Sequence, residues 1–265
     1  NFNHPSLIIW AYMNEVLLRP TFDEKTEKER YELYTNNIVK LASKIEDKIR
    51  SLDPSRYTMI VNHGAIDRYM NAGLTDIPML LGWNLYQGWY GGVFEHFDKD
   101  LDKIHRLFPS KPIIISEYGA DVHHRLHTFS PERFDYTVEY GNRYHEHYLK
   151  AIMARPFIVG ANIWNLNDFY SETRGYAMPN TNLKGITTLN REKKDTWWLY
   201  KTKLSEEPII KFGQNEWKIR GGIVETGEDY CLQPVTVYSS SDSVQLIHNN
   251  VVYNAEVKDY IARFS

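Results

Sequence analysis

The feature that most constrains the fold is a regular alternation of short apolar runs with long amphipathic segments over the first 205 residues. Apolar runs of strand length lie at residues 7–13, 57–61, 78–84, 112–116 and 157–164. Helical spacing of apolar side chains predicts helices at residues 26–52, 94–108, 131–154 and 195–204. Apolar runs without alternation are typical of strands buried on both faces, and strands that alternate with helices predict parallel βα units.

The composition changes after Pro208, where helical periodicity ends. Short β-rich runs follow at residues 235–238, 244–247 and 251–253, with Gly and Ser between them. We therefore predict an α/β domain over residues 1–205 and the start of an antiparallel β-sandwich domain over residues 206–265.

Composition and motifs narrow the function classes. The net charge of −3, with signs mixed along the chain, gives no electrostatic case for nucleic acid or an anionic membrane. No apolar run approaches the roughly 18 residues that a membrane span needs. A Rossmann or flavodoxin-like sheet would also fit the number of predicted strands. However, no G-x-G-x-x-G or G-x-x-x-x-G-K-[ST] loop follows a strand, which argues against a nucleotide-binding protein. No H-E-x-x-H spacing is present, and we expect neither a catalytic metal nor a cofactor.

Two glutamates directly follow predicted strands. Glu15 comes after the first apolar run and Glu117 after the fourth. The C-terminal ends of parallel strands in a barrel point to one face, where active sites are built. Glycoside hydrolysis needs two carboxyl groups at such a place, one to protonate the leaving oxygen and one to attack the anomeric carbon. A glutamate at a strand end is more often a solvated loop residue, so the neighbouring residues decide between the two interpretations.

The sequences around the two glutamates resemble motifs of glycoside hydrolase family 2. His4-Pro-Ser-Leu-Ile-Ile-Trp10 followed by Asn14-Glu15 is similar to the family's acid/base signature, and Ile115-Ser-Glu-Tyr-Gly-Ala-Asp121 to its nucleophile signature. The segments 82–90, 163–169 and 184–191 are similar to the family's intervening segment, last barrel strand and following loop. The order and spacing of these motifs agree over roughly residues 1–205.

The resemblance implies strands 4–8 of a (β/α)8 TIM barrel, followed by a partial all-β sandwich. On this basis the N-terminal part of the same enzyme, with strands 1–3, is needed to complete the barrel, and we expect residues 1–265 alone to be inactive or poorly soluble. A targeting signal would lie upstream. The compartment stays open, with a bacterial periplasmic or secreted enzyme as one hypothesis.

The resemblance also implies residue roles in a retaining mechanism. Glu15 would be the general acid/base and Glu117 the nucleophile, with Tyr86 hydrogen-bonded to Glu117 and Asn14 to the sugar 2-hydroxyl. Ordinary packing or loop roles remain the alternative for each aromatic or histidine side chain in this set. The other predicted substrate contacts are Asn84, Tyr90, Trp164 and His63.

The identity of the sugar depends on Asn182-Leu183-Lys184-Gly185. This segment resembles the Asn-x-Lys-Gly motif with which β-glucuronidases of the family bind the sugar carboxylate. However, Lys-Gly also occurs in β-galactosidases, and position 178 is Met near where glucuronidases commonly have Arg. We therefore predict a retaining exo-β-glycosidase that acts on terminal β-linked sugars, of the β-galactosidase type. A β-glucuronidase with Asn182 and Lys184 on the carboxylate is the first alternative, and a non-catalytic carbohydrate-binding relative is an alternative of another class.

Overall fold

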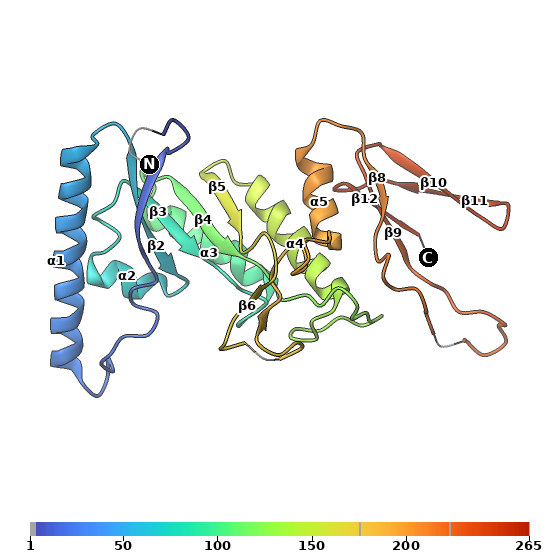
Figure 1. Ribbon diagram of the computed structural model, residues 1–265, viewed down its shortest axis with the longest axis horizontal. Helices are drawn as coiled ribbons and strands as arrows, with labels where there is room; N and C mark the ends of the chain where they lie inside the picture. The colour runs from blue at the N-terminus through green and yellow to red at the C-terminus, as the bar shows by residue number, and fades with distance from the viewer. Residues whose placement is uncertain (1–3, 175, 223, 265) are drawn as a thin grey trace. The chain divides into compact units, whose positions relative to one another are not determined.

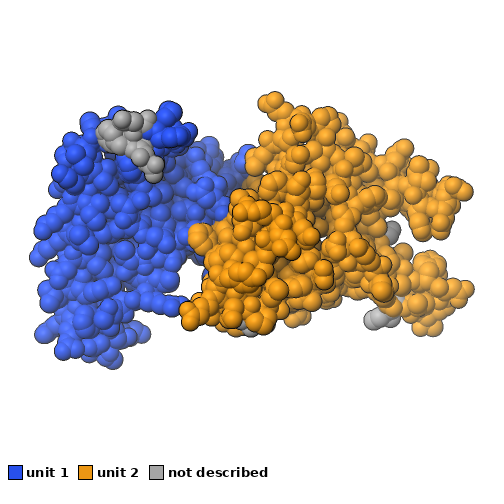
Figure 2. All heavy atoms as spheres, viewed as in Figure 1, with its two compact units in different colours: residues 1–118, 151–163 blue, residues 119–150, 164–265 orange. Residues whose placement is uncertain are grey.

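The computed structural model describes residues 4–174, 176–222 and 224–264. The chain divides into two compact units, residues 1–118 with 151–163 and residues 119–150 with 164–265 (Figure 2). The strands of the first unit are β1 (Ile9–Asn14), β2 (Tyr57–His63), β3 (Leu80–Asn84), β4 (Ile113–Tyr118) and β5 (Ile158–Ile163). Its helices are α1 (Lys28–Leu52), α2 (Ile66–Ala72) and α3 (Phe94–Leu107). Within the described ranges, no helix is long and apolar enough to cross a bilayer.

The five strands form one parallel sheet in the order β1-β2-β3-β4-β5 (Figure 1). This confirms the predicted parallel βα arrangement. The middle of the sheet is densely packed, because a Cβ added at Gly82 on β3 would lie 2.9 Å from the Val61 side chain and 3.2 Å from Ser116 Oγ. A larger residue at Gly82 would therefore push apart the strands that carry the candidate site.

The two edge strands are more exposed than the central ones. Every residue of β3 is buried, whereas Val159 on β5 is 60% exposed and Ala11 on β1 is also exposed. Residues of a parallel strand are normally covered on both faces. The exposure pattern therefore matches the expectation that β1 and β5 each have a further neighbour in a closed barrel.

Helix spacing and polar contacts explain how the helices pack. On α3 the buried side chains are Phe97, Leu101 and Ile104, which repeat at the spacing of one helix face.

The end of α1 is fixed by Asp53, whose carboxylate accepts hydrogen bonds from Trp10 Nε1 at 2.9 Å and Arg56 Nη1 at 2.6 Å. These contacts tie the start of β1 to the turn before β2.

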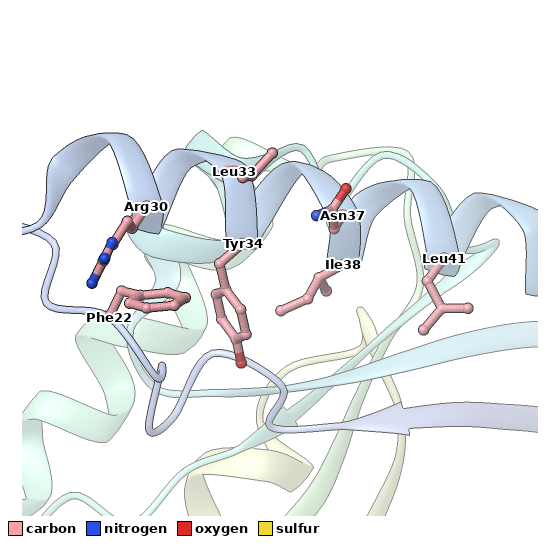
Figure 3. Close-up of a pocket in the computed structure, with 7 residues that line it drawn as sticks. All are labelled: Phe22, Arg30, Leu33, Tyr34, Asn37, Ile38 and Leu41. Atoms are coloured by element: carbon pink, nitrogen blue, oxygen red, sulfur yellow. The ribbon is translucent and has the colours of Figure 1, made fainter.

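A groove of about 640 Å³ lies along one flank of α1 (Figure 3). Phe22, from the loop before the helix, forms one end of it, and its ring meets that of Tyr34 edge-on at 6.1 Å. Leu33 and Leu41 are 62% and 53% exposed there. These leucines lie off the buried face of α1, whose buried residues are Tyr31, Thr35, Ala42 and Glu46. The remaining lining residues are Arg30, Asn37 and Ile38.

The second unit contains most of α4 (Val138–Met153), α5 (Asp195–Leu204) and only short or antiparallel strands. A three-stranded sheet has the order β12-β9-β8, and β10 pairs with β11. The antiparallel β character predicted after residue 208 is thus confirmed. The strands are β6 (Phe169–Tyr170), β7 (Thr181–Asn182), β8 (Ile210–Phe212), β9 (Val235–Ser239), β10 (Ser243–His248), β11 (Val251–Glu256) and β12 (Ile261–Phe264).

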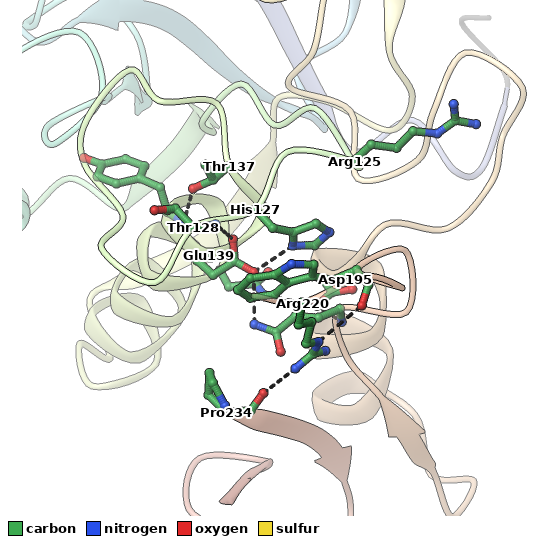
Figure 4. A network of polar contacts seen from close by, with 12 residues as sticks. Arg125, His127, Thr128, Thr137, Glu139, Asp195, Arg220 and Pro234 are labelled. Carbon is green, nitrogen blue, oxygen red and sulfur yellow. Dashed lines mark hydrogen bonds and ion pairs between the residues drawn. The ribbon is translucent and has the colours of Figure 1, made fainter. Parts of the chain in front are cut away.

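A polar and aromatic network joins the segment before α4 to the beginning of the β-rich part (Figure 4). Glu139 accepts hydrogen bonds from Thr128 N at 3.1 Å and Gln214 Nε2 at 3.0 Å, and lies 2.8 Å from His127 Nδ1. The His127 ring stacks on Trp217 with centroids 4.9 Å apart. The network fixes the predicted boundary region near residue 206 to the α/β part within this unit.

The predicted start of the helix at residue 131 is wrong, because α4 begins at Val138. Asp135 accepts hydrogen bonds from the backbone of Glu132 and Thr137, and Phe134 and Tyr136 have positive φ, so the segment before α4 is a series of turns. Thr137 Oγ1 then accepts a hydrogen bond from Tyr140 N at 3.2 Å and caps the helix. The short elements α2, β6, β7, β8 and β12 were not predicted.

Candidate active site

The candidate catalytic residues lie at the C-terminal ends of neighbouring strands. Asn14 ends β1 and is paired in register with Val61 on β2, His63 ends β2 opposite Asn84 on β3, and Asn84 is opposite Glu117 on β4. Because the strands are parallel, these ends share one edge of the sheet. Glu117 is inside β4, not after it, so a regular strand fixes its backbone.

Asn84 connects the two strands that carry the glutamates. Its Nδ2 donates to Glu15 Oε1 at 2.9 Å and to Asn14 Oδ1 at 3.1 Å, and its Oδ1 accepts from Ser116 Oγ at 2.8 Å. The side chain is buried, with an exposed fraction of 2%. Asn84, which was predicted as a substrate contact, holds the acid/base candidate from the side.

Glu117 is held by two contacts from the segment after β3. Tyr86 Oη donates to Glu117 Oε2 at 2.8 Å, which is the hydrogen bond that the resemblance implied. The backbone oxygen of Glu117 accepts from Leu85 N at 2.9 Å. Tyr90 is 48% exposed and its ring centroid lies 5.1 Å from that of Tyr86. A phenol donor on a carboxylate stabilises its ionised form, which a nucleophile requires.

Glu15 is placed by its backbone as well as by Asn84. Its N–H donates to Val61 O at 2.9 Å, its C=O accepts from Leu18 N at 2.9 Å, and its φ is +52°. A non-glycine residue with positive φ is uncommon and persists where the surrounding structure fixes it. The chain therefore turns sharply at Glu15, and the neighbouring Asn14 side chain stays exposed.

His63 was predicted to reach the barrel mouth. In the structure its Nδ1 lies 2.8 Å from Tyr69 Oη. Burial, with a smaller contribution from the positive charge of Arg68, lowers the pKa of His63 to about 4. His63 is therefore neutral at pH 7.

The second unit contains Trp164, Asn182 and Lys184. Trp164 is 38% exposed and meets Phe169 edge-on at 6.2 Å. Asn182 and Lys184 are buried, and Asn182 Oδ1 accepts a hydrogen bond from Lys184 N at 3.1 Å. These three residues are thus arranged within a unit that is separate from the one that carries Glu15 and Glu117.

The ammonium of Lys184 already has a carboxylate partner in this chain. Lys184 Nζ forms an ion pair with Asp121, and the two side chains are 0% and 6% exposed. Asp121 Oδ1 also accepts from Leu183 N at 3.0 Å. Because Asp121 supplies the counter-charge, the burial of Lys184 does not by itself indicate an anionic sugar.

A second buried ion pair supports the same loop. Lys194 Nζ donates to Asp168 Oδ1 and to Val122 O, both at 2.7 Å, and to Leu183 O at 3.0 Å. Burial raises the pKa of Asp168 to about 6, against the opposing effect of Lys194. Both pairs fix the backbone on either side of Lys184, and neither Asp121 nor Lys194 was predicted. Asp121 could have been found, since it ends the motif that contains Glu117.

No metal site is evident in the described part of the chain, where no group of three or more His, Cys, Asp or Glu side chains could hold an ion.

Comparisons with known proteins agree with this geometry. The model of the glycosyl hydrolases family 2 TIM barrel domain matches residues 1–207. A β-glucuronidase of Bacteroides fragilis is 29% identical over 83% of this chain and 30% of its own length. A β-galactosidase of Bacteroides ovatus is 25% identical over 97% of this chain and 32% of its own length.

A solved structure of similar fold is Bacteroides uniformis β-glucuronidase 2 covalently bound to cyclophellitol-6-carboxylate aziridine. It has a TM-score of 0.91 and 34% identity, over 99% of this chain and 31% of that chain. The chain therefore spans about a third of the length of the relatives it matches.

Proposed function

Because this chain belongs to glycoside hydrolase family 2, we propose that it is the part of a retaining β-glucuronidase that carries both catalytic carboxylates. One observation carries this proposal: Glu15 and Glu117 lie at the same edge of a parallel sheet, each held by a dedicated hydrogen-bond donor. A non-catalytic carbohydrate-binding relative would have no need to keep both carboxylates and both donors in place.

In the first step Glu117 attacks the anomeric carbon, and the bond from that carbon to the glycosidic oxygen breaks. Glu15 gives its proton to the leaving oxygen. Since Asn84 donates to Oε1 of Glu15, the transferred proton is on Oε2. The hydrogen bond from Tyr86 keeps Glu117 ionised and oriented before the attack.

In the second step a water molecule attacks the anomeric carbon and releases Glu117. Glu15, now ionised, takes a proton from that water and returns to its starting state. Two displacements at one carbon give a product that retains the β configuration. Asn14, next to Glu15 and exposed, is positioned to hydrogen-bond the sugar 2-hydroxyl, a contact that strengthens in the transition state.

The relatives favour a glucuronide over the galactoside that the sequence led us to put first. Several of them are β-glucuronidases, and one was captured with a carboxylate-bearing inhibitor. The segment Asn182-Leu183-Lys184-Gly185, which resembles the carboxylate-binding motif of β-glucuronidases in the family, also supports a glucuronide. A β-galactosidase remains the second candidate, because the Lys184–Asp121 pair is already neutral and one relative that spans most of this chain is a β-galactosidase.

We also propose that the chain acts within a longer polypeptide. The relatives are about three times its length, and a five-stranded sheet with exposed edge strands does not close a barrel. On this proposal the preceding part of the polypeptide pairs with β1 and covers the groove on α1. The experiment must therefore use the full-length protein.

The test measures hydrolysis of p-nitrophenyl β-D-glucuronide and β-D-galactoside by the full-length wild type, Glu117→Ala and Glu15→Ala. The glucuronide should be preferred, and each variant should lose at least about 100-fold in kcat, within the range that general acid–base catalysis contributes. Glu95→Ala, at an exposed glutamate of the same unit, should be unchanged. Preference for the galactoside would favour the second candidate, and activity retained by Glu117→Ala would refute the proposed nucleophile.

A further inference from the structure

We propose that Tyr69, with Arg68, positions the general acid/base by holding the backbone two residues after Glu15. This inference rests on the proposed role of Glu15. Both residues lie on α2, a short helix that the sequence did not reveal.

The two side chains bind opposite sides of one residue. Leu17 N donates to Tyr69 Oη at 3.2 Å, and Leu17 O accepts from Arg68 Nη1 at 3.0 Å. Leu17 itself is fully buried. With the bond from Leu18 N to Glu15 O, these contacts fix the whole turn that begins at Glu15.

The direction of the hydrogen bonds at Tyr69 follows from its neighbours. The Tyr69 oxygen accepts from Leu17 N, so its own proton is free to be donated to His63 Nδ1, 2.8 Å away. His63 can accept it because the ring is neutral, with burial lowering its pKa to about 4. The neutral ring must then carry its proton on Nε2. Tyr69 thus links the backbone after β1 to the end of β2.

The surroundings of Tyr69 make this link rigid. Its side chain has no exposed surface, and its ring meets His63 and Trp83 edge-on at 5.1 and 6.3 Å. Burial raises the pKa of Tyr69 to about 12, and the negative charge of Glu15 adds to the effect. Tyr69 is therefore a neutral donor and acceptor close enough to Glu15 to sense its charge.

Arg68 holds the same loop at a second point. Its Nη2 lies 3.6 Å from Glu24 Oε2, further along the connection from β1 to α1. The contacts from α2 hold the backbone after Glu15, whereas Asn84 holds the side chain of Glu15. The two supports come from different elements next to β2, Asn84 from β3 and the contacts to Leu17 from α2.

The consequence is specific to acid catalysis. A displaced Glu15 protonates the leaving oxygen poorly, which matters for leaving groups of high pKa and little for those that depart as stable anions. Tyr69→Phe should lower kcat/KM for phenyl β-D-glucuronide by roughly 10- to 100-fold, a part of the effect of general acid catalysis. With the 2,4-dinitrophenyl glucuronide the loss should stay below about 3-fold.

Tyr200→Phe is a matched control. Tyr200 Oη also contacts a histidine ring, at 3.0 Å from His145 Nδ1, but it belongs to the second unit. Each variant removes one hydroxyl from a buried tyrosine that contacts a histidine.

The experiment uses the full-length protein. Equal losses of Tyr69→Phe on both glucuronides, or no loss beyond that of Tyr200→Phe, would overturn the inference. If Tyr69→Phe does not fold, Arg68→Met tests the same loop, and the absence of a leaving-group dependence there would also overturn it. If Glu15→Ala itself lacks that dependence, the proposed function fails, and the two failures are thereby distinguished.

Discussion

Removal of the Lys184 ammonium should destabilise the protein for a reason unrelated to substrate. The side chains of Lys184 and Asp121 are 0% and 6% exposed, so Lys184→Met leaves a buried carboxylate without its cation. Loss of one partner from a buried pair costs about 3–5 kcal/mol in the free energy of unfolding. The double variant Lys184→Met/Asp121→Asn removes both charges and keeps an acceptor for Leu183 N, so most of the loss should be recovered.

The same variants separate scaffolding from sugar binding. A charge-assisted hydrogen bond to a sugar carboxylate is worth about 1.5–3 kcal/mol, which corresponds to roughly 10- to 150-fold in kcat/KM. In the stable double variant, kcat/KM should fall by that factor for the glucuronide and by less than about 3-fold for the galactoside. The assay is urea unfolding together with steady-state kinetics of the full-length protein. A Lys184→Met variant within about 1 kcal/mol of wild type would refute the burial argument. Parallel losses on both sugars would refute the role in binding.

Three further predictions concern other parts of the chain. Tyr86→Phe removes the 2.8 Å donor to Glu117, so kcat should fall by roughly 10- to 150-fold with little change in KM; an unchanged kcat would contradict the role of the phenol. Burial lowers the pKa of His145 to about 3, so between about pH 3 and 6.5 the unfolded chain binds a proton that the folded chain does not, and the free energy of unfolding rises with pH. Urea unfolding at several pH values should show this rise, by up to about 1.4 kcal/mol per pH unit, and a smaller rise in His145→Gln. If the preceding polypeptide covers the α1 groove, Leu33→Glu should lower the free energy of unfolding of the full-length protein by roughly 1–3 kcal/mol. Leu204→Glu, at a leucine that is 71% exposed, should have no such effect.

Local patterns predicted most of the first unit and, in the second unit, α5. The apolar runs and helix periods are properties of neighbouring residues, and their strands and helices agree with β1 to β5, α1, α3 and α5 to within a few residues. The same locality identified Glu15 and Glu117, since each follows an apolar run directly. The start of α4 was missed because Asp135 and Thr137 form turns and a cap, a local competition that helical periodicity does not register.

Contacts between distant residues could not be read from one sequence. Lys184 and Asp121 are 63 positions apart, and Tyr69 and Leu17 are 52 apart. Lys184 could be identified from its motif, but the reason for its burial is the ion pair with Asp121, which the motif does not reveal. Similarly, the seven-residue α2 is too short to show a period, although it provides both contacts to Leu17.

The different supports of the two glutamates suit the different roles proposed for them. Glu117 lies within a regular strand and accepts a hydrogen bond from a phenol, a stronger donor than an amide, which suits a carboxylate proposed to attack as an anion. In the proposed acid/base role Glu15 would change its protonation state twice in each cycle, and the Asn84 amide can donate to Oε1 whether or not Oε2 carries a proton. A side-chain donor that tolerates both states cannot by itself fix the position of the carboxyl group. Rigid placement then has to come from the backbone, which is what the contacts of α2 with Leu17 provide.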